Sequence, residues 1–469
     1  MSLEPTGQPD VDVAIVGGGA AGVLVATRLL ADPASRLRVA IVEPAVELAR
    51  GVAYATRQPA HLLNVAAGRM SAFAEDPGHF VRFLAATTDA SGDTALEASF
   101  PARHDYGRYL RETLSAQPRY PSLRWLREQV IDIERRGDDN LLSFASGGTL
   151  AARAVVLAVG NAPRRLPAAR LHGEIRLADA WDYEAVAAIP VEADVCIVGS
   201  GLSMVDAVLS LAAGGHRGRI HVLSRHGLMP LAHAAAGGAA GGPLDALLSQ
   251  GLRCRLRQIR AWARAATAAG EPWQWVFDRL RPHGQALWCS LAPAEQQRFL
   301  RHLVRYWDIH RHRIAPQVAS ALDDLRAAGR LDAVAGHLLS IGARAGGEAE
   351  VIYRPRGGDE VRTIRADWII NATGVETRID LQPDTLMGAL RTRGRVLPGP
   401  HGMGIASEEP GRVLDARGQP DPALFVLGAM RIGTLWESLA IPELRGQARA
   451  LADQLHAQLE GGSQAGSAR

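Results

Sequence analysis

A glycine-rich turn that occurs twice constrains the fold of this chain more than any other feature. The first copy, "VGGGAAG" at residues 16–22, follows the apolar run "VDVAIV" and leads into an apolar segment with helical spacing. The second copy, "VGSGLSM" at residues 198–204, follows "DVCIV" in the same way, and the two begin 199 − 17 = 182 residues apart. A strand, a glycine turn, a helix and a further strand form the βαβ unit that holds a pyrophosphate at the helix N-terminus. We therefore predict two such units in one chain.

The first copy has the complete dinucleotide-binding pattern. Its first glycine permits the tight turn, the second lets the backbone approach a phosphate, and the third allows the helix to pack closely on the strand. Glu43 ends the next strand, 43 − 22 = 21 residues after the last glycine, where a carboxylate can bind a ribose hydroxyl. This acid favours FAD as the ligand. The predicted contacts are Gly17, Gly19, Ala20, Ala21, Gly22 and Glu43.

The second copy keeps the two glycines that face a phosphate and loses the third. Met204 stands where the first copy has Gly22. Because that glycine serves only the close packing of helix on strand, we expect Met204 to push its helix slightly outward. The turn remains suited to a pyrophosphate, with Gly199, Gly201 and Ser203 as predicted contacts.

The strand after the second turn ends without an acid. Ser224 aligns with Glu43, and Arg225 follows it. A carboxylate would repel a 2′-phosphate, whereas a hydroxyl and a guanidinium can bind one, so Ser224 and Arg225 favour NADPH. The alternative is that Arg225 is an ordinary solvated arginine. One turn would then hold FAD, and the other would receive the NADPH that reduces it.

Composition bounds the other functions. With 469 residues, 47% of them hydrophobic, the chain can form two or three cored domains. Its 52 basic and 49 acidic residues are scattered, which argues against nucleic acid as a partner. There is no run of about 18 apolar residues and no signal peptide, so we expect no membrane partner. Three cysteines without a C-x-x-C pair exclude a disulfide framework or a dithiol relay and indicate a reducing, cytoplasmic location.

The pattern of elements predicts an α/β fold of two Rossmann-like domains, the first of them discontinuous. The chain turns helical and rich in Arg and Trp after a Gly/Ala-rich stretch at 233–243, which suits a mobile loop. The expected parts are residues 1–185 as the first part of the FAD domain, 186–334 as the NAD(P)H domain with a helical insertion at about 244–325, 335–460 as the second part of the FAD domain, and 461–469 as a disordered tail.

Further segments resemble one group of enzymes. They are "GVAYATRQPAHLLNVAAGRMSAF", "RHDYGRYL", "VVLAVGNAP", "VGSGLSMVDAVLSL", "YWDIHRHRIAP", "WIINATG" and "GTLWESLAIPELRGQA". Together with the first turn, they resemble the two-dinucleotide-binding-domain flavoproteins, and within these the bacterial FAD/NAD(P)-binding proteins akin to class B flavin monooxygenases and amine N-hydroxylases. The resemblance covers nearly the whole chain.

The resemblance implies further flavin contacts. "VVLAVGN" and "WIINATG" end at Gly160 and Gly374 and resemble the strands that return the chain to the flavin, although a plain strand exit would look the same. Ala429, after Gly428, stands where most of the group has an acid on the ribityl chain. We expect a helix beginning near Thr434 to direct its N–H groups at the flavin pyrimidine. The implied contacts are Gly160, Gly374, Gly428, Thr434, Trp436 and Glu437, the last two alternatively being simple helix-start residues.

Two segments resemble the walls of the flavin's reactive face in relatives. His61, Asn64, Arg69 and Tyr106 lie in them as candidates for catalysis, with Asn64 also a candidate cofactor contact. A capping or core hydrogen-bonding role is the alternative for each.

The basic segment at residues 302–316 invites a metal interpretation, which we disfavour. His310 and His312 are two positions apart, and this spacing puts them on different helix faces. A solvated basic helix is the first alternative, and arginines that meet an anionic substrate or the NADPH phosphates are the second. We expect no metal site.

The function that follows is an FAD-dependent, NADPH-reduced monooxygenase. By the resemblance, it would act through a C4a-hydroperoxyflavin on a small nucleophilic substrate, with N-hydroxylation of an amine or amino acid favoured. An NAD(P)H:acceptor reductase or oxidase would use the same nucleotide motifs, and a non-catalytic flavin redox sensor is the third alternative.

Overall fold

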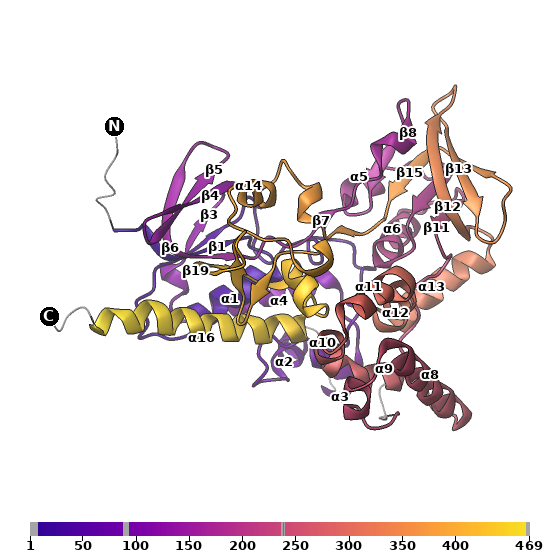
Figure 1. Cartoon of the computed structure of the whole chain (residues 1–469). Helices are drawn as coiled ribbons and strands as arrows, with labels where there is room; N and C mark the ends of the chain where they lie inside the picture. The colour runs from indigo at the N-terminus through magenta and orange to yellow at the C-terminus, as the bar shows by residue number, and fades with distance from the viewer. Residues whose placement is uncertain (1–7, 88–92, 236–237, 239, 466–469) are drawn as a thin grey trace.

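The computed structural model describes residues 8–87, 93–235, 238 and 240–465. These residues form two α/β domains side by side and a group of helices beneath the second domain (Figure 1). The prediction of two dinucleotide-binding domains is thereby confirmed at the level of topology.

The first domain is built on a sheet in which nine strands are described, with the central order β17-β18-β19-β6-β1-β2-β3, where β17 is Ser407–Glu408 and β18 is Arg412–Leu414. The hairpin of β4 (Val130–Arg136) and β5 (Asp139–Phe144) joins it through the pairing of β5 with residues 149–152 of β6. Its central strands are parallel neighbours and are buried on both faces, which is why they read as continuous apolar runs. They are β1 (Val11–Val16) and β2 (Val39–Val42), with the C-terminal halves of β6 (Thr149–Leu157) and β19 (Pro420–Val426). The strand β3 (Arg124–Leu126), at the end of this order, is more exposed.

Three helices cover one face of this sheet. The helix α1 (Ala20–Leu29) packs against α4 (Arg103–Ser115) and against the long α16 (Ile441–Ala465), which runs along the underside of the domain in Figure 1. Apolar side chains from all three join one buried cluster with β1. Because α16 continues to Ala465, residues 461–465 of the predicted disordered tail are helical, and the last four residues lie outside the described part.

The second domain has its own sheet, with the order β14-β13-β12-β11-β10-β15-β9 among the described strands and β8 (Leu171–His172) paired to β12. The strands β9, β15, β10, β11 and β12 are parallel, as a βαβ fold requires. Two helices, α6 (Leu202–Ala213) and α13 (Pro316–Ala327), join its core. The strands are β9 (Leu177–Asp179), β10 (Val195–Val198), β11 (Ile220–Ser224), β12 (Leu331–Ala343), β13 (Ala349–Pro355), β14 (Arg362–Ala366) and β15 (Trp368–Asn371).

This topology corrects the expected division of the chain. The segments 171–179 and 335–371 were assigned to the FAD domain, yet their strands lie in the second sheet. The reason is that β10 needs a parallel neighbour on each side, and Trp368–Asn371 supplies one of them along the full length of Val195–Val198. Most of the apolar run "WIINATG" is therefore a strand of the second sheet, beside β10.

The chain crosses between the domains twice, and the two crossings lie side by side. The strands β7 (Ala162–Pro163) and β16 (Val375–Glu376) pair antiparallel as a two-residue ribbon. Gly160 and Gly374 precede these strands with φ angles of 70° and 93°, values that favour glycine. Both glycines thus belong to the inter-domain connections.

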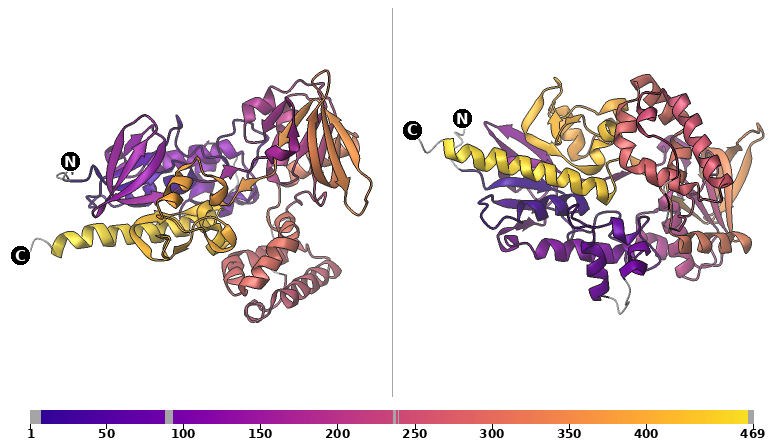
Figure 2. Two further views of the ribbon diagram at one scale, coloured as in Figure 1. Left: turned by 45° about the horizontal axis from the view of Figure 1, so that its top comes forward. Right: turned by 90° about the horizontal axis from the view of Figure 1, so that it is seen from below.

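The predicted helical insertion is present and forms a separate lobe, which is clearest in the left view of Figure 2. Its last predicted helix, α13, instead lies against α6 in the second domain, so the lobe ends at α12. Residues 236, 237 and 239 of the predicted mobile loop lie outside the described residues. The lobe comprises α7 (Asp245–Leu248), α8 (Leu252–Ala268), α9 (Gln274–Leu280), α10 (Gly284–Cys289), α11 (Pro293–His302) and α12 (Val304–Arg311).

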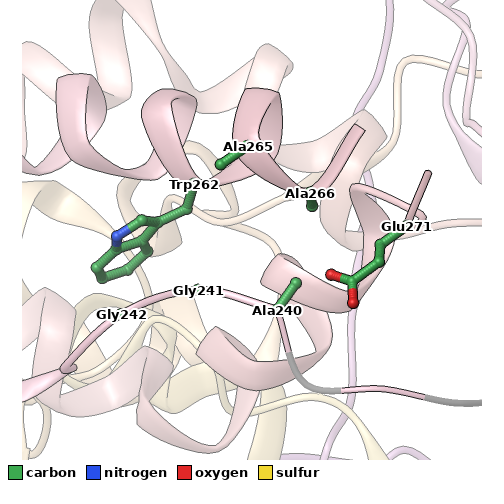
Figure 3. A pocket seen from close by; sticks show the side chains of 7 residues that line it. All are labelled: Ala240, Gly241, Gly242, Trp262, Ala265, Ala266 and Glu271. Atoms are coloured by element: carbon green, nitrogen blue, oxygen red, sulfur yellow. The ribbon is translucent and has the colours of Figure 1, made fainter. Parts of the chain in front are cut away.

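A small cavity of about 350 Å³ lies inside this lobe. Gly241 and Gly242 border it beneath the indole of Trp262 on α8, with Glu271 at its far end (Figure 3). None of its lining residues belongs to a glycine turn, so we place the nucleotide sites elsewhere.

Candidate nucleotide sites and the cavity between them

The first glycine turn has no room for a side chain at Gly17 or Gly22. A Cβ on Gly17 would lie 2.4 Å from the carbonyl oxygen of Ala158, and one on Gly22 would lie 1.9 Å from the carbonyl oxygen of Gly17. Gly19 is the N-cap of α1, and the helix has neither a side-chain cap nor an acid in its first turn. The unpaired N–H groups at such a helix end, with the positive end of the helix dipole, fit a phosphate group.

Glu43 lies beside this turn, at the end of β2. One carboxylate oxygen accepts a hydrogen bond of 2.7 Å from the N–H of Gly18, and the other accepts one of 3.0 Å from the N–H of Ala45. The C-terminal end of β19 adjoins the same place, because a Cβ on Gly428 would lie 3.5 Å from the Cβ of Ala21. The predicted residues of this site therefore gather in one place.

The second turn repeats the first. A Cβ on Gly199 would lie 2.1 Å from the carbonyl oxygen of Ala372, and Gly201 is the N-cap of α6, again without a side-chain cap or an acid in the first turn. Met204 is fully buried in the core of the second domain. The outward displacement of α6 that we expect from Met204 stays a prediction.

The hydroxyls predicted to contact the second nucleotide are bonded within the protein. Ser203 Oγ accepts a hydrogen bond of 3.0 Å from the indole N–H of Trp181. Ser224 Oγ accepts one of 2.9 Å from Ser200 Oγ and one of 3.0 Å from the N–H of Gly227. These bonds hold the end of β11 against the glycine turn.

Arg225 lies in a group of like charges. It is exposed and has no ion-pair partner among the described residues. Partial desolvation lowers its pKa below the usual range, and Arg305 and Arg164 add to this effect. The other two have partners: Arg305 pairs with Asp308 at 3.1 Å, and Arg164 with Glu376 at 3.4 Å. An arginine without a counter-ion beside other arginines suits an anionic ligand.

Two further residues complete this basic group. The ring of His226 lies 5.9 Å from that of Tyr306, whose hydroxyl accepts a hydrogen bond of 3.4 Å from Arg356 Nη2. Arg356 and Arg305 come from segments far from Arg225 in the sequence, and only Arg305 fell in a segment that the sequence marked as basic. Sequence analysis missed Arg356 entirely.

A larger cavity, of about 730 Å³, lies where the first domain meets the helical lobe. Its walls come from the short helix η1 (Ala67–Arg69), from the segment joining α9 to α10, and from the first turns of α16. Charged side chains of both signs line it, including Arg69, Arg281, Glu437 and Glu443. Its volume lies within the range of ligand sites.

Ion pairs tie the lobe to the first domain along this cavity. The buried carboxylate of Glu437 accepts a hydrogen bond of 2.9 Å from Arg311 Nη2 and one of 3.3 Å from the indole N–H of Trp307. Arg281 lies 3.6 Å from Glu443, and burial together with Arg311 lowers the pKa of Arg281 to about 10. Glu437 is therefore engaged by the lobe.

The four candidate catalytic residues separate in the structure. Arg69 lines the larger cavity and lies 3.7 Å from Asp278. Asn64 presents its backbone carbonyl to His233 Nε2 at 3.0 Å. His61 and Tyr106 are both fully buried and do not line the cavity.

Tyr106 is a core residue. Its hydroxyl donates a hydrogen bond of 2.8 Å to the carbonyl of Met70, and its ring packs against Tyr54 and Phe80. Burial raises the pKa of Tyr106 well above its usual value. The structure therefore replaces our expectation of a wall residue with that of a structural tyrosine, the alternative that the sequence left open.

The helix expected near Thr434 does not begin there. A short helix, α15 (Ile432–Leu435), ends at that point, and α16 begins only at Ile441. Trp436, between them, has a φ of 61° and stacks on Trp288 at 4.9 Å. A tryptophan in the left-handed region interrupts a helix, so Thr434, Trp436 and Glu437 precede α16 rather than form its first turn.

Arg431 is a buried residue that the sequence analysis missed. Its side chain is fully enclosed and contacts Glu409 at 2.7 Å and Gln447 at 3.4 Å. Gln447 also accepts a hydrogen bond of 3.3 Å from the N–H of Gly428. This network lies just beyond Ala429.

The described residues contain no group of three or more His, Cys, Asp or Glu side chains suited to a metal ion. In the same part of the chain, every helix is too short or too polar to cross a bilayer.

Comparison with known proteins agrees with this architecture. Residues 14–162 match a family model described as FAD-NAD(P)-binding. Among curated proteins, none matches this sequence. The likeness that covers the whole chain is to solved structures.

Three such structures are similar to nearly the full length of this chain. The reduced ornithine hydroxylase of Pseudomonas aeruginosa is 19% identical, with a TM-score of 0.65 over 96% of this chain and 99% of that one. The ornithine N-hydroxylase of Kutzneria sp. 744, with reduced FAD, NADP+ and L-ornithine, is 16% identical, with a TM-score of 0.63 over 96% and 100%. The FAD-bound cadaverine monooxygenase of Erwinia amylovora is 15% identical, with a TM-score of 0.61 over 96% and 94%. The chain therefore has the fold of the two-dinucleotide-binding-domain flavoproteins, with a helical insertion in its second domain.

Proposed function

We propose that this protein is an FAD-dependent, NADPH-reduced monooxygenase that hydroxylates the nitrogen of a small amine or amino acid. The observation that carries the proposal is the pair of uncapped glycine turns, one beside a fixed carboxylate and the other beside an arginine without a counter-ion. A carboxylate suits a ribose hydroxyl and an arginine suits a 2′-phosphate, so each turn would take a different nucleotide.

The residues present fit both nucleotides. Gly17, Gly19 and Glu43 would hold FAD with the backbone around Gly428, while Gly199 and Arg225 would hold NADPH. When bound, the flavin would accept hydride from NADPH and activate oxygen, and the protein's part would be to position the two nucleotides and to exclude water.

Oxygen transfer is favoured over transfer of electrons to a protein disulfide. The chain has three cysteines, of which Cys196 is buried in β10 and has its pKa raised to about 12 by burial. Cys254 and Cys289 lie in different helices of the lobe, and neither is disulfide-bonded. Three solved structures of similar fold are described as hydroxylases or monooxygenases of ornithine or cadaverine, which supports the same reaction class here.

The larger cavity is our candidate for the substrate site. Arg69 comes from the first domain and Arg281 from the helical lobe, so a small molecule in this cavity would contact both. Its charged lining suits a polar substrate rather than an apolar one. We also propose a cytoplasmic location, on the basis of the three free cysteines.

The deciding experiment is rapid mixing of the NADPH-reduced protein with oxygen. We expect a transient species that absorbs in the near ultraviolet before the oxidised flavin spectrum returns. Direct return of the oxidised spectrum, with one hydrogen peroxide formed per NADPH in the presence of ornithine, lysine and cadaverine, would favour the reductase or oxidase instead. Protein that binds no FAD would contradict the proposal altogether.

A further inference from the structure

The two domains meet at a buried polar joint on the helix that follows the second glycine turn. Asp206 and Ser210 lie four residues apart on α6 and so share one face of the helix. That face meets a loop of the first domain, residues 56–63, and the start of α4; α4 and α6 are labelled in Figure 1.

His61 is at the centre of this joint and is fully buried. Its Nδ1 lies 2.7 Å from Thr56 Oγ1 in the first domain. Its Nε2 lies 2.9 Å from the carbonyl oxygen of Asp206 and 3.0 Å from Ser210 Oγ in the second. A neutral ring that accepts from Thr56 and donates to Asp206 satisfies both ring nitrogens, so the imidazole bridges the domains.

An enclosed ion pair lies beside the histidine. Arg103, the first residue of α4, contacts the carboxylate of Asp206 at 2.7 Å, and both side chains are about 85% buried, at 15% and 14% exposure. The N–H of Arg103 also donates a hydrogen bond of 2.8 Å to the carbonyl of His61. His61 and Arg103 thus contact each other, and each also contacts α6.

Apolar contacts surround the polar ones. Ala60, Leu62 and Phe100 of the first domain pack against the buried core of the second, which includes Val205 and Val208 of α6. A buried pair is costly to separate because each charge would lose its partner. The joint therefore resists rotation of one domain against the other, a motion that the two-residue ribbon of β7 and β16 alone would permit.

We infer that His61 and Arg103 are positioning residues that fix the NADPH-binding turn relative to the flavin-binding turn. Asp206 lies five residues beyond Gly201, about 7.5 Å along the helix axis, so a shift at the joint moves the phosphate-binding end of α6 with it. In this role, neither His61 nor Arg103 would contact a nucleotide. The expected effect on catalysis rests on the proposed function. The stability of the joint can be measured without catalysis.

The test compares two Asp→Asn variants of the full-length protein. Asp206→Asn breaks the joint. The control Asp12→Asn breaks an ion pair within the first domain, where the side chain of Asp12 is 11% exposed and lies 3.0 Å from Arg38, which is 46% exposed. Hydrogen–deuterium exchange should increase in residues 56–63 and 202–213 for Asp206→Asn only. Equal exchange in both variants would overturn the joint.

The catalytic consequence is measured as the rate of flavin reduction under anaerobic conditions at saturating NADPH. We expect at least a tenfold slower rate for Asp206→Asn, an unchanged Kd for NADPH, and a wild-type rate for Asp12→Asn. A wild-type rate in Asp206→Asn despite increased exchange would overturn the positioning role.

If Asp206→Asn does not fold, Ser210→Ala is the second variant, because it removes only the hydroxyl that contacts His61. It should slow flavin reduction about threefold, and an unchanged reduction rate would overturn the positioning role. Wild-type protein that NADPH does not reduce would contradict the proposed function, while the exchange experiment would still test the joint.

Discussion

The two glycine turns share a backbone and differ in what lies around it. In each, a glycine with positive φ packs against the end of a neighbouring strand, at Ala158 in one case and at Ala372 in the other, and each helix begins without a side-chain cap. The difference lies at the end of the following strand, where one turn has a carboxylate and the other an arginine among arginines. We therefore propose that both turns bind phosphate in the same way and that a few side chains outside the turn select the nucleotide.

The largest effect should come from filling the third glycine of the first turn. Gly22→Ala places a Cβ 1.9 Å from the carbonyl oxygen of Gly17, a distance that forces the helix away from the turn. We expect protein with at least a hundredfold weaker affinity for FAD, measured by titration of the apoprotein followed by flavin fluorescence.

Met204→Ala changes the residue at the equivalent position of the second turn. It should leave FAD binding intact and lower the free energy of unfolding by about 2–5 kcal/mol, the usual cost of a cavity in the core. Unchanged FAD affinity in Gly22→Ala would show that the first turn is not the flavin site.

The next effect concerns the arginine without a counter-ion. Arg225→Ala should raise the KM for NADPH by 10- to 150-fold, which corresponds to about 1.5–3 kcal/mol for a charge-assisted contact. The KM for NADH should change little because NADH has no 2′-phosphate. Steady-state NAD(P)H oxidation with both donors gives the comparison. An equal rise for both would show that Arg225 does not distinguish the two sites.

A smaller effect is expected for the arginine that the sequence did not reveal. Arg356 reaches the same basic group through Tyr306, so Arg356→Ala should raise the KM for NADPH about threefold and weaken its dependence on salt. Arg344, on the same sheet but paired with Glu350 at 2.7 Å, provides the control as Arg344→Ala. The same threefold change in both variants would point to general electrostatics rather than to a phosphate contact.

The smallest effect is a pH dependence of stability that arises between the two turns. Burial lowers the pKa of His61, and Arg103 lowers it further, against the opposing carboxylate of Asp206; Tyr183 also packs against the ring. A lowered pKa means that the folded protein holds the ring neutral, while the unfolded chain binds a proton below about pH 6.5. The stability that His61 contributes should therefore be full above that pH and decrease as the pH falls, adding at most about 1.4 kcal/mol per pH unit to the slope of the whole protein. Denaturant titrations from pH 7.5 to 5 should show a slope in the wild type that is shallower by this contribution in His61→Gln. Identical slopes would remove His61 as the cause.

The sequence predicted best where local chemistry decides the structure. Both turns and their flanking strands follow from glycine spacing and continuous apolar runs, which have the same meaning in any parallel sheet. The sequence predicted poorly which of the two sheets a strand belongs to when the strand could pair with either. Trp368–Asn371 is an apolar run that ends near a glycine, and nothing in those residues distinguishes an edge beside β10 from one beside β6.

The candidate site shows the same division. Glu43 and Arg225 could be identified because their positions follow from alignment of the two turns. His61, by contrast, is a polar residue in an apolar segment, which suits a ligand contact and a buried joint equally well. Arg356 gave no signal, because its place near β11 depends on the pairing of β12 with β13, and such long-range contacts cannot be derived from a local pattern.

The paired crossings have a consequence for how such a protein can be rebuilt. Because β7 and β16 lie side by side, everything between them leaves the first domain and returns to it at almost one point. The first domain is a continuous sheet without that excursion, since β6 and β19 are hydrogen-bonded neighbours. The second domain is thus an insertion in the chain of the first. A replacement grafted between residues 161 and 377 would leave the strand order of the first domain unchanged, but it would have to supply partners for His61, Arg103 and Glu437.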